Sequence, residues 1–388
     1  LVLWKTWGNI PFYEENLTSL PYLADQLTVD QVYEKVVVDL ESVLDSEVLP
    51  MKQPDEWAGR MTQAAASMIY ADYVMYQKDQ SRYGKALGYM KAIINSHKYD
   101  LVKNYNDLYA LDKEWNEEII FDVNYIAKGG KRTWGDANFT GGTVYPEMIG
   151  IDGLTIKCAE GHTPEFTSGW GFGSVSKEVY DAFEDNDRRR DVAILNLDKY
   201  ARAKFAEGDT VTYGGRYQNT GYFLRKYLPR PGDTEGSVGD AGLNHDENLH
   251  LYRYAETLLN AAELALATGD GLAQDYFDLV RERAGVASIP VTVDNIINER
   301  RLEFVGEGKR YFDLVRSGKA ATVLKAGAGV VLRTKRTYNF DKNQWEGENT
   351  WGGQAIPERV DWTENKKYIP IPQSEIEAAQ GSITQNPY

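Results

Sequence analysis

The sequence predicts a mainly α-helical fold of degenerate tetratricopeptide-like helix pairs (α-solenoid type), with a loop-rich insert and a few short strands. Apolar residues recur at helical spacing in adjoining segments, whereas two long stretches rich in Gly and aromatic residues show no periodicity. We expect one domain over residues 1–388. It comprises repeat helices (1–110), a loop-rich region (111–248), further repeat helices (249–321) and an irregular carboxy-terminal segment (322–388).

The amino-terminal part contains three helical segments. In residues 29–44 one face is apolar, and Thr28 is the expected N-cap. Residues 62–76 hold small side chains, which let another helix approach closely, and residues 81–99 repeat large apolar ones. The short polar link between the last two segments predicts an αα-hairpin.

The middle of the chain changes character. Residues 117–126 alternate, with Ile119, Phe121, Val123 and Tyr125 on one side, which predicts a short half-buried strand. Residues 128–173 and 207–244 are then loop-like. Helical periodicity returns at Leu249 and predicts a second hairpin, whose two helices end at Gly269 and Gly285. Residues 292–320 predict a third.

Composition excludes several classes of function. The chain has 388 residues and a formal net charge of −15, which disfavours binding to nucleic acid or to anionic lipid. A single cysteine, Cys158, rules out an intrachain disulfide, and no run of about 18 apolar residues is present. The chain starts without Met or a leader sequence, so we expect the natural protein to begin earlier.

The segment GEGKR (306–310) has the residue types of a phosphate loop but not the spacing. Gly306 and Gly308 are one residue apart, and no Ser or Thr follows Lys309. We interpret it as a turn between two helices. The charged residues around this turn are Glu299, Arg300, Arg301, Glu303, Glu307, Arg310, Asp313 and Arg316. Their density predicts an internal ion-pair network. The alternative is a charged face that is exposed to solvent.

Motifs for catalysis and metal binding are weak. His245 and His250 are five residues apart, which does not place two ligands on one helix face. The carboxylates of FEDNDRRRDVAI (183–194) adjoin three arginines, which keep carboxyl pKa values low and suit a structural role. We therefore expect no enzyme activity, no metal and no cofactor.

The aromatic loops remain as the candidate binding site. Trp and Tyr rings pack against the C–H faces of sugars, and polar neighbours bond the hydroxyl groups. The candidates are Trp134, Asp136, Asn138, Phe139, Tyr145, Phe166, Trp170 and Phe172. The alternative for each ring is that it anchors its loop in the helical body, and we expect at least one ring to contact a ligand.

Five stretches resemble the SusD/RagB family of outer-membrane nutrient-binding lipoproteins of Bacteroidota. NERRLEFVGEGKRYFDLVRSGKA (298–320) is similar to the family's Glu-Arg-Arg…Glu-Gly-x-Arg…Phe-Asp-Leu-x-Arg signature, and KYIPIPQSEIEAAQGSITQNPY (367–388) to its Tyr-Pro-Ile-Pro…Thr-Gln-Asn-Pro ending. LYRYAETLLNAAELALATGD (251–270), WGNIPFYEE (7–15) and RMTQAAASMIYADYVMYQKD (60–79) also resemble family segments.

The resemblance implies non-catalytic, cell-surface binding of an oligosaccharide or polysaccharide. It implies delivery of this glycan to a SusC-like, TonB-dependent outer-membrane transporter, with no nucleic-acid partner. It also implies a surface-exposed protein on the outer membrane, held by a lipid anchor that precedes this chain, with 111–248 on the ligand side. No binding residue is carried over from the family. Two alternatives stay open: capture of a peptide or other nutrient, and a purely structural helical-repeat scaffold.

Overall fold

The computed structural model describes residues 1–20, 22–136, 141–158, 163–205, 208–214, 219–326, 337–346 and 360–386. The helices are α1 (Val2–Trp7), α2 (Val29–Asp45), α3 (Gln63–Gln77), α4 (Tyr83–Asn95), α5 (Tyr145–Ile149), α6 (Lys177–Asp181), α7 (Arg190–Ala193), α8 (Leu197–Lys204), α9 (Tyr254–Thr268), α10 (Ala273–Ala284), α11 (Val293–Glu303), α12 (Arg310–Arg316), α13 (Ala320–Val323) and α14 (Gln373–Ala378). The strands are β1 (Ile10–Pro11), β2 (Gln26–Leu27), β3 (Ile119–Val123), β4 (Ile151–Asp152), β5 (Thr155–Lys157), β6 (Ser168–Gly169), β7 (Leu195–Asn196), β8 (Thr210–Thr212), β9 (Tyr222–Phe223), β10 (Leu249–Arg253), β11 (Thr337–Asn339) and β12 (Gln344–Glu346).

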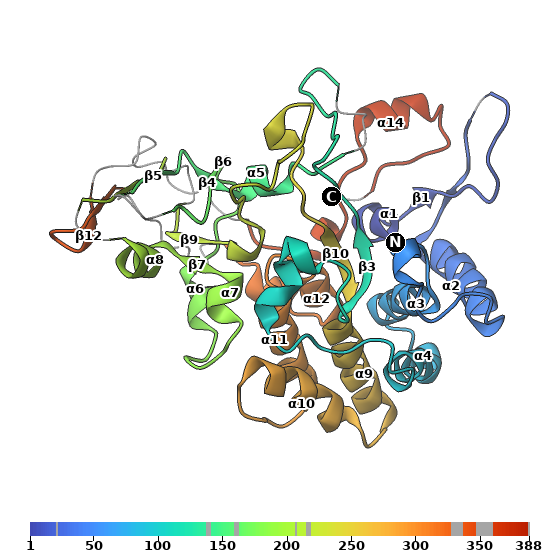
Figure 1. The fold of residues 1–388 in the computed structure, drawn as a ribbon. Helices are drawn as coiled ribbons and strands as arrows, with labels where there is room; N and C mark the ends of the chain where they lie inside the picture. Colours follow the sequence, from blue (N-terminus) through green and yellow to red (C-terminus); the bar gives the residue numbers. More distant parts are fainter. Residues whose placement is uncertain are drawn as a thin grey trace.

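The longer helices form one body, and the short strands lie beside it. In Figure 1, α2, α3 and α4 stand on one side, α9 to α12 fill the lower centre, and β4 to β9 with α6 to α8 form the opposite side. The helices share a single hydrophobic cluster that runs from α1 to α11. The predicted fold class is confirmed: the described chain is mostly helical, with helix pairs and few short strands.

The helix pairs form where the sequence predicts them. Thr28 caps α2 and Thr62 caps α3, each through its side-chain oxygen. Ala64, Ala65 and Ala71 are fully buried, so α3 lies close to its neighbours α2 and α4. α9 then packs on both α4 and α10, which joins the two sets of repeat helices into one body.

The strand β10 corrects the prediction that a helix begins at Leu249. Residues 249–253 pair antiparallel with β3, and α9 begins only at Tyr254, whose N–H donates to the Glu118 carbonyl at 2.8 Å. β3 is a strand as predicted, but its more buried side differs: Ile120 and Asp122 are buried, whereas Phe121 and Val123 on the predicted side are half-buried. Asp122 is paired there with Nδ1 of His250 at 2.9 Å, so this histidine has a structural partner.

The loop-rich side has its own core. β12, β11, β8 and β5 form a four-stranded sheet whose buried residues pack with α8 in a second hydrophobic cluster. This sheet corrects the prediction that the last segment is irregular throughout. Residues 337–346 make a hairpin because Tyr338 and Trp345 pair across it and turn inward, a partner contact that local periodicity does not reveal.

The two ends of the chain meet on the helical body. The Asn386 side chain donates to the Trp7 carbonyl at 2.6 Å, and Gln26 exchanges hydrogen bonds with Thr384. The family-like ending is therefore part of the fold.

The charged turn between α11 and α12 is a helix-to-helix connection, as predicted. Gly306 and Gly308 adopt left-handed backbone angles, with φ of 78° and 73°. A Cβ at Gly306 would lie 2.4 Å from the Leu224 side chain, so only glycine fits under the loop-rich region.

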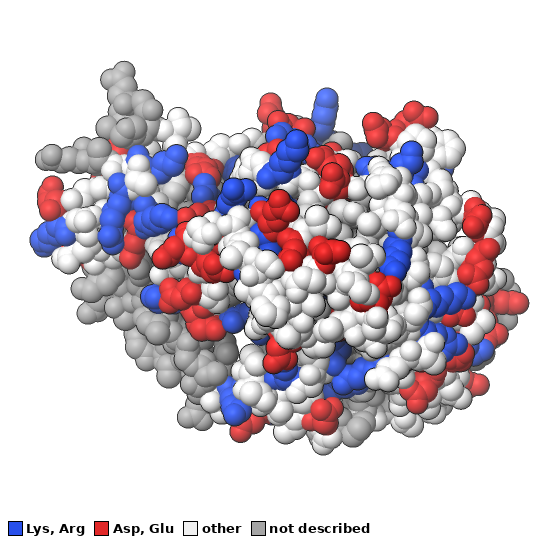
Figure 2. All heavy atoms as spheres, turned by 90° about the horizontal axis from the view of Figure 1, so that it is seen from below, with Lys and Arg blue, Asp and Glu red and all other residues white. Residues whose placement is uncertain are grey.

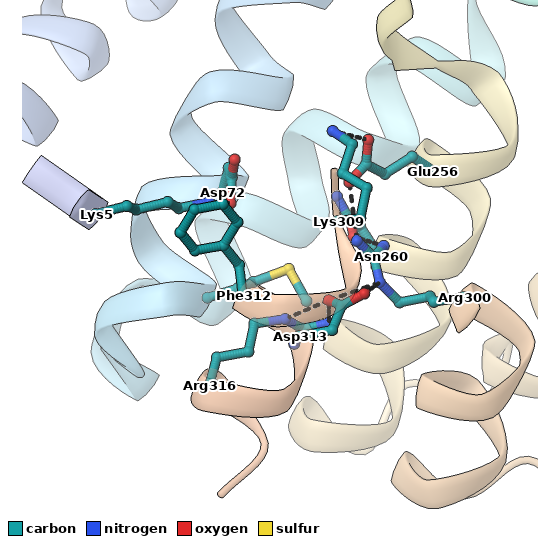
Figure 3. A pocket seen from close by; sticks show the side chains of 10 residues that line it. Lys5, Asp72, Glu256, Asn260, Arg300, Lys309, Phe312, Asp313 and Arg316 are labelled. Carbon is teal, nitrogen blue, oxygen red and sulfur yellow. Dashed lines mark hydrogen bonds and ion pairs between the residues drawn. The ribbon is translucent and has the colours of Figure 1, made fainter. Parts of the chain in front are cut away.

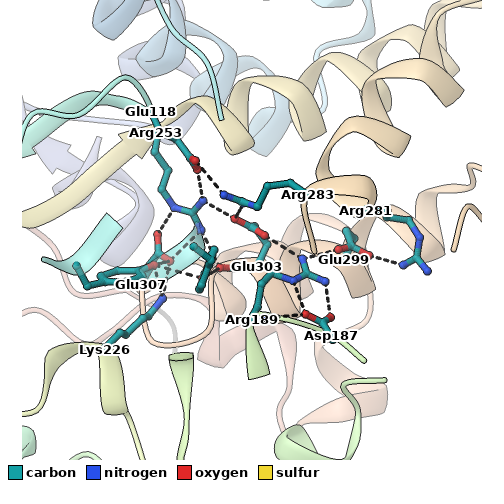
Figure 4. Close-up of polar contacts among 12 residues, drawn as sticks. Glu118, Asp187, Arg189, Lys226, Arg253, Arg281, Arg283, Glu299, Glu303 and Glu307 are labelled. Atoms are coloured by element: carbon teal, nitrogen blue, oxygen red, sulfur yellow. Dashed lines mark hydrogen bonds and ion pairs between the residues drawn. The ribbon is translucent and has the colours of Figure 1, made fainter. Parts of the chain in front are cut away.

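The predicted ion-pair network is confirmed, and most of it is fully buried. Figure 4 shows Glu303 at its centre, facing guanidinium groups from three separate parts of the chain. Arg189 comes from the loop-rich region and reaches Glu303 at 2.9 Å, Arg253 comes from β10, and Arg283 comes from α10. Burial opposes ionisation of Glu303, but Arg283, Arg253 and Arg189 outweigh it and hold its pKa far below the ordinary value.

Further pairs extend this network in both directions. Glu307 accepts from Arg253 Nε at 2.9 Å and from Lys226 Nζ at 2.6 Å, and Glu299 joins Arg189 to Arg281. Arg301 and Arg310 differ from the rest of the predicted set. Arg301 pairs with the exposed Glu178, and Arg310 is only half-buried.

Removing the central carboxylate should destabilise the fold. In Glu303→Ala, two or more buried guanidinium groups lose their counter-charge, which costs about 3–5 kcal/mol of unfolding free energy. Urea or guanidinium denaturation measures this change. The control is Lys177→Ala, which breaks an exposed pair with Asp181 and should leave the stability unchanged. Equal stability of Glu303→Ala and the control would contradict a structural role for the network.

A buried carboxyl should make the stability fall toward alkaline pH. Burial raises the pKa of Glu247 to about 8, from an ordinary value of 4.5. Between these two pH values the folded state holds a proton that the unfolded state releases, so the free energy of unfolding falls as pH rises. Glu247→Gln removes this titration. Melting temperatures from about pH 5 to about pH 9 should therefore decline less steeply in the variant, and parallel curves would refute the assignment.

Candidate functional site

Three of the predicted aromatic residues form an exposed cluster, which we call the aromatic platform: Trp134, Trp170 and Phe172. The centroids of the Trp134 and Trp170 rings are 5.5 Å apart with an interplanar angle of 35°, and Phe172 meets Trp170 edge-on at 6.3 Å. Trp134 is 71% exposed and Phe172 is 51% exposed, while Trp170 is half-buried between them. The cluster therefore presents ring faces to solvent.

Trp134 is held at the tip of a tight turn. Thr133 and Asp136 exchange backbone hydrogen bonds of 3.0 and 3.2 Å across it. The Trp134 N–H donates to Oδ2 of Asp240 at 2.9 Å, and the Asp240 N–H in turn donates to the Arg132 carbonyl at the same distance. An acidic side chain from the second loop-like stretch thus fixes the ring, and the sequence contains no local signal for this long-range contact.

Trp170 and Phe172 are held by the end of α5. The N–H groups of Trp170, Gly171 and Phe172 donate to the carbonyls of Glu147, Gly150 and Met148 at 2.8, 2.6 and 3.0 Å.

The crossing of these two segments requires glycine. Gly150 and Gly169 touch backbone to backbone, and a Cβ on Gly169 would lie 2.5 Å from the Gly150 Cα. The glycines of the loop therefore allow close crossing of two segments, which gives the rings a rigid base.

Polar groups lie beside the rings. Asp136 is half-exposed, two residues after Trp134, and Arg132 extends its guanidinium over the Tyr125 ring at 5.8 Å. Flat apolar faces with charged hydrogen-bonding groups at their edge suit a ligand with a C–H-rich face and a rim of hydroxyl groups.

Two other candidates are placed as loop anchors. Phe166 is 3% exposed and belongs to the second hydrophobic cluster, with the Arg230 guanidinium 5.5 Å from its ring. Tyr145 is half-buried, lies edge-on to Tyr227, and donates its hydroxyl to the Gly306 carbonyl at 3.3 Å; burial raises its pKa to about 12. Neither ring belongs to the platform. Asn138 and Phe139 lie outside the described residues.

A polar cavity between α1, α3, α9 and α12 is not suited to a sugar (Figure 3). Its volume of about 30 Å³ holds roughly one water molecule. Its charged lining is already paired, with Arg300 bonded to Asp313 and Lys309 to Glu256. We interpret it as part of the structural charge network.

Other classes of site find little support in the described part of the chain. Among these residues no three His, Cys, Asp or Glu side chains gather in a way that could hold a metal ion. None of the helices described has the length and apolar composition to cross a membrane. In Figure 2, basic side chains on the visible face are interspersed with acidic ones, so that face offers no continuous basic surface for a phosphate backbone.

Comparison with known proteins identifies solved structures with the same fold. Surface glycan-binding protein A from Bacteroides thetaiotaomicron, solved in complex with laminarihexaose, is 42% identical; the match covers 100% of this chain and 75% of that one, with a TM-score of 0.82. A laminarin-binding SusD-like protein is 28% identical over 99% of this chain and 75% of that one, with a TM-score of 0.78.

The curated relatives are more distant. A SusD-like protein of Bacteroides ovatus is 23% identical over 89% of this chain and 59% of its own length, so this chain spans about 60% of that relative. A sequence model of the SusD family matches residues 117–388, which include the loop-rich region, the charged turn and the carboxy-terminal ending. Together with the 42% identity over the whole chain, this match shows that the protein belongs to the SusD family.

Proposed function

We propose that this protein binds a β-1,3-glucan of the laminarin type on its aromatic platform and leaves the glycan chemically unaltered. The observation that carries the proposal is the exposed indole of Trp134, which lies against the half-buried Trp170 ring on a base of closely crossing segments. Two of the similar structures are described as a complex with laminarihexaose and as laminarin-binding, which supports the choice of ligand.

The chemistry of the platform favours a sugar over a peptide. A peptide that adds a strand needs free backbone donors and acceptors at its binding edge. Here the N–H groups of Trp134, Trp170, Gly171 and Phe172 are already bonded within the protein. What remains accessible is the ring faces and the side chains at their edge, which is the surface that a pyranose needs.

The scaffold alternative is less favoured because it predicts buried aromatic residues. Phe166 fits that expectation, but Trp134 and Phe172 are largely exposed. Exposed aromatic rings gathered in one place are typical of a binding surface.

The proposal includes delivery of the glycan. Membership of the SusD family supports a lipid-anchored position on the outer face of the outer membrane, next to a SusC-like, TonB-dependent transporter. The bound glucan would pass from the platform to that transporter. Catalysis has no part in this role, because the platform acts through packing and hydrogen bonds.

Truncating the platform should weaken binding. Loss of one stacked indole in Trp134→Ala or Trp170→Ala costs about 1.4 kcal/mol, roughly a tenfold increase in the Kd for laminarihexaose. Isothermal titration calorimetry measures this change.

The matched control is Tyr22→Ala. Tyr22 is 54% exposed, on the loop between β1 and β2, and outside the platform. It should bind laminarihexaose like the wild-type protein. Unchanged affinity in both Trp variants would show that the site lies elsewhere, and a wild-type protein that binds no laminarin would contradict the function.

A further inference from the structure

A second exposed indole lies on the connection between α2 and α3. Trp57 ends a short 3₁₀ turn, Asp55–Trp57, that is closed by backbone hydrogen bonds from Trp57 and Ala58. It is 50% exposed. The Arg60 guanidinium lies over the ring at 4.3 Å from its centroid. An ordered turn thus presents a tryptophan to solvent in a stacked arrangement.

Hydrogen-bond donors surround a small pocket beside this turn. Lys52, Arg60 and Trp115 line it together with the carboxylate Asp55, and its volume of about 30 Å³ admits one hydroxyl group, so a sugar ring would lie outside it on the exposed indole. The Lys52 ammonium lies over the Tyr99 ring at 4.9 Å, and burial lowers its pKa. In the described parts of the chain, no carboxylate is within ion-pair distance of Lys52 or Arg60, and the indole N–H of Trp115 has no acceptor. These donors are available to a ligand.

Lys52 and Arg60 bring two positive charges to one small pocket. The protein carries a net charge of −15, and the other Lys and Arg side chains discussed above are mostly paired with carboxylates. Burial of Lys52 removes part of its hydration, and the charges of Asp55 and Glu117, which lie beyond ion-pair distance, offset only part of this loss. A ligand with hydroxyl groups would supply acceptors to these donors.

The backbone around the pocket is specialised as well. Trp115 has a φ of 57°, a left-handed angle that is unusual for a bulky residue. Gly59 has a φ of 87°, and a Cβ there would lie 2.5 Å from the Asn124 side chain and 3.5 Å from the Trp115 ring. The turn that carries Trp57 is therefore seated on Trp115 and on the residue that follows β3.

The contact between Gly59 and Asn124 links the pocket to the aromatic platform along the backbone. Asn124 leads directly to Tyr125, whose ring lies under Arg132, and Arg132 is two residues before Trp134. The segment that follows β3 thus touches the Trp57 turn at its start and carries Trp134 of the platform at its other end.

We propose that Trp57, Arg60, Lys52 and Trp115 form a second sugar-binding subsite, which takes another stretch of a long glucan chain. A sugar ring would pack on the indole of Trp57, and its hydroxyl groups would accept from Lys52, Arg60 and the Trp115 indole N–H. This inference rests on the proposed function. A chain that contacts both places is held more strongly than one that contacts either, because the second contact forms at a high effective concentration.

The test compares retention by the laminarin polymer in affinity gel electrophoresis. The proteins are the wild type, Trp57→Ala, Trp134→Ala and the double variant, each also run in a gel without polysaccharide. We expect Trp57→Ala to weaken retention at least threefold and the double variant to be retained less than either single one. Trp57→Tyr keeps a flat ring and should keep most of the retention.

Tyr22→Ala is the control for loss of an exposed aromatic residue and should behave like the wild type. Lys52→Ala, tested in parallel, should also weaken retention, without removing a ring. If Trp57→Ala and Lys52→Ala are both retained like the wild type while Trp134→Ala is not, the second subsite is wrong and the proposed function stands. If the wild type is not retained at all, both proposals fail.

Discussion

The buried ion pairs around Glu303 are the constraint on which the rest of the structure depends. Charges removed from water are tolerated only when their partners are in place, so the network requires several segments to meet at one point. Glu303 pairs with Arg189 of the loop-rich region, with Arg253 of β10 and with Arg283 of α10. The helical body and its loops are thereby joined by electrostatic contacts as well as by hydrophobic packing.

This junction is connected to the aromatic platform through a short series of contacts. In the turn after α11, Glu307 forms an ion pair with Lys226, and Gly306 packs against the Leu224 side chain. Tyr145, the first residue of α5, bonds the Gly306 carbonyl, and the last turn of α5 then holds the backbone of Trp170 and Phe172. The platform is therefore connected to the network by one short helix. The charged turn and the loops that carry the aromatic platform are physically linked in this protein.

Much of the helical body could be predicted from the sequence, because its signals are local. Thr28 and Thr62 cap helices, and Gly269 and Gly285 end them in left-handed conformation, as their positions indicated. The charges near Gly306 also indicated an internal network, since so many Arg and Glu residues in one segment need partners.

The predictions that were wrong depend on contacts between residues that are far apart in the sequence. The periodicity of Leu249–Arg253 merges with that of α9 and predicts a helix, whereas pairing with β3 decides its conformation. The hairpin of β11 and β12 depends on aromatic packing across a turn and on β8. For the site, composition identified the region but could not separate exposed rings from anchors. Phe166 and Trp170 have similar neighbours in the sequence. In the fold, Phe166 is buried under the Arg230 guanidinium, whereas the backbone of Trp170 is bonded to α5 and its ring stays half-buried.

The central claim is that the exposed rings on this rigid base hold a glucan, and a crystal structure of the protein with laminarihexaose tests it most directly. The account predicts electron density for a sugar ring packed on Trp134 or Trp170, with hydroxyl groups facing the side chains beside them, and an unchanged backbone at Gly150 and Gly169. A hexaose bound away from both Trp134 and Trp170, with these rings in contact only with solvent, would contradict it.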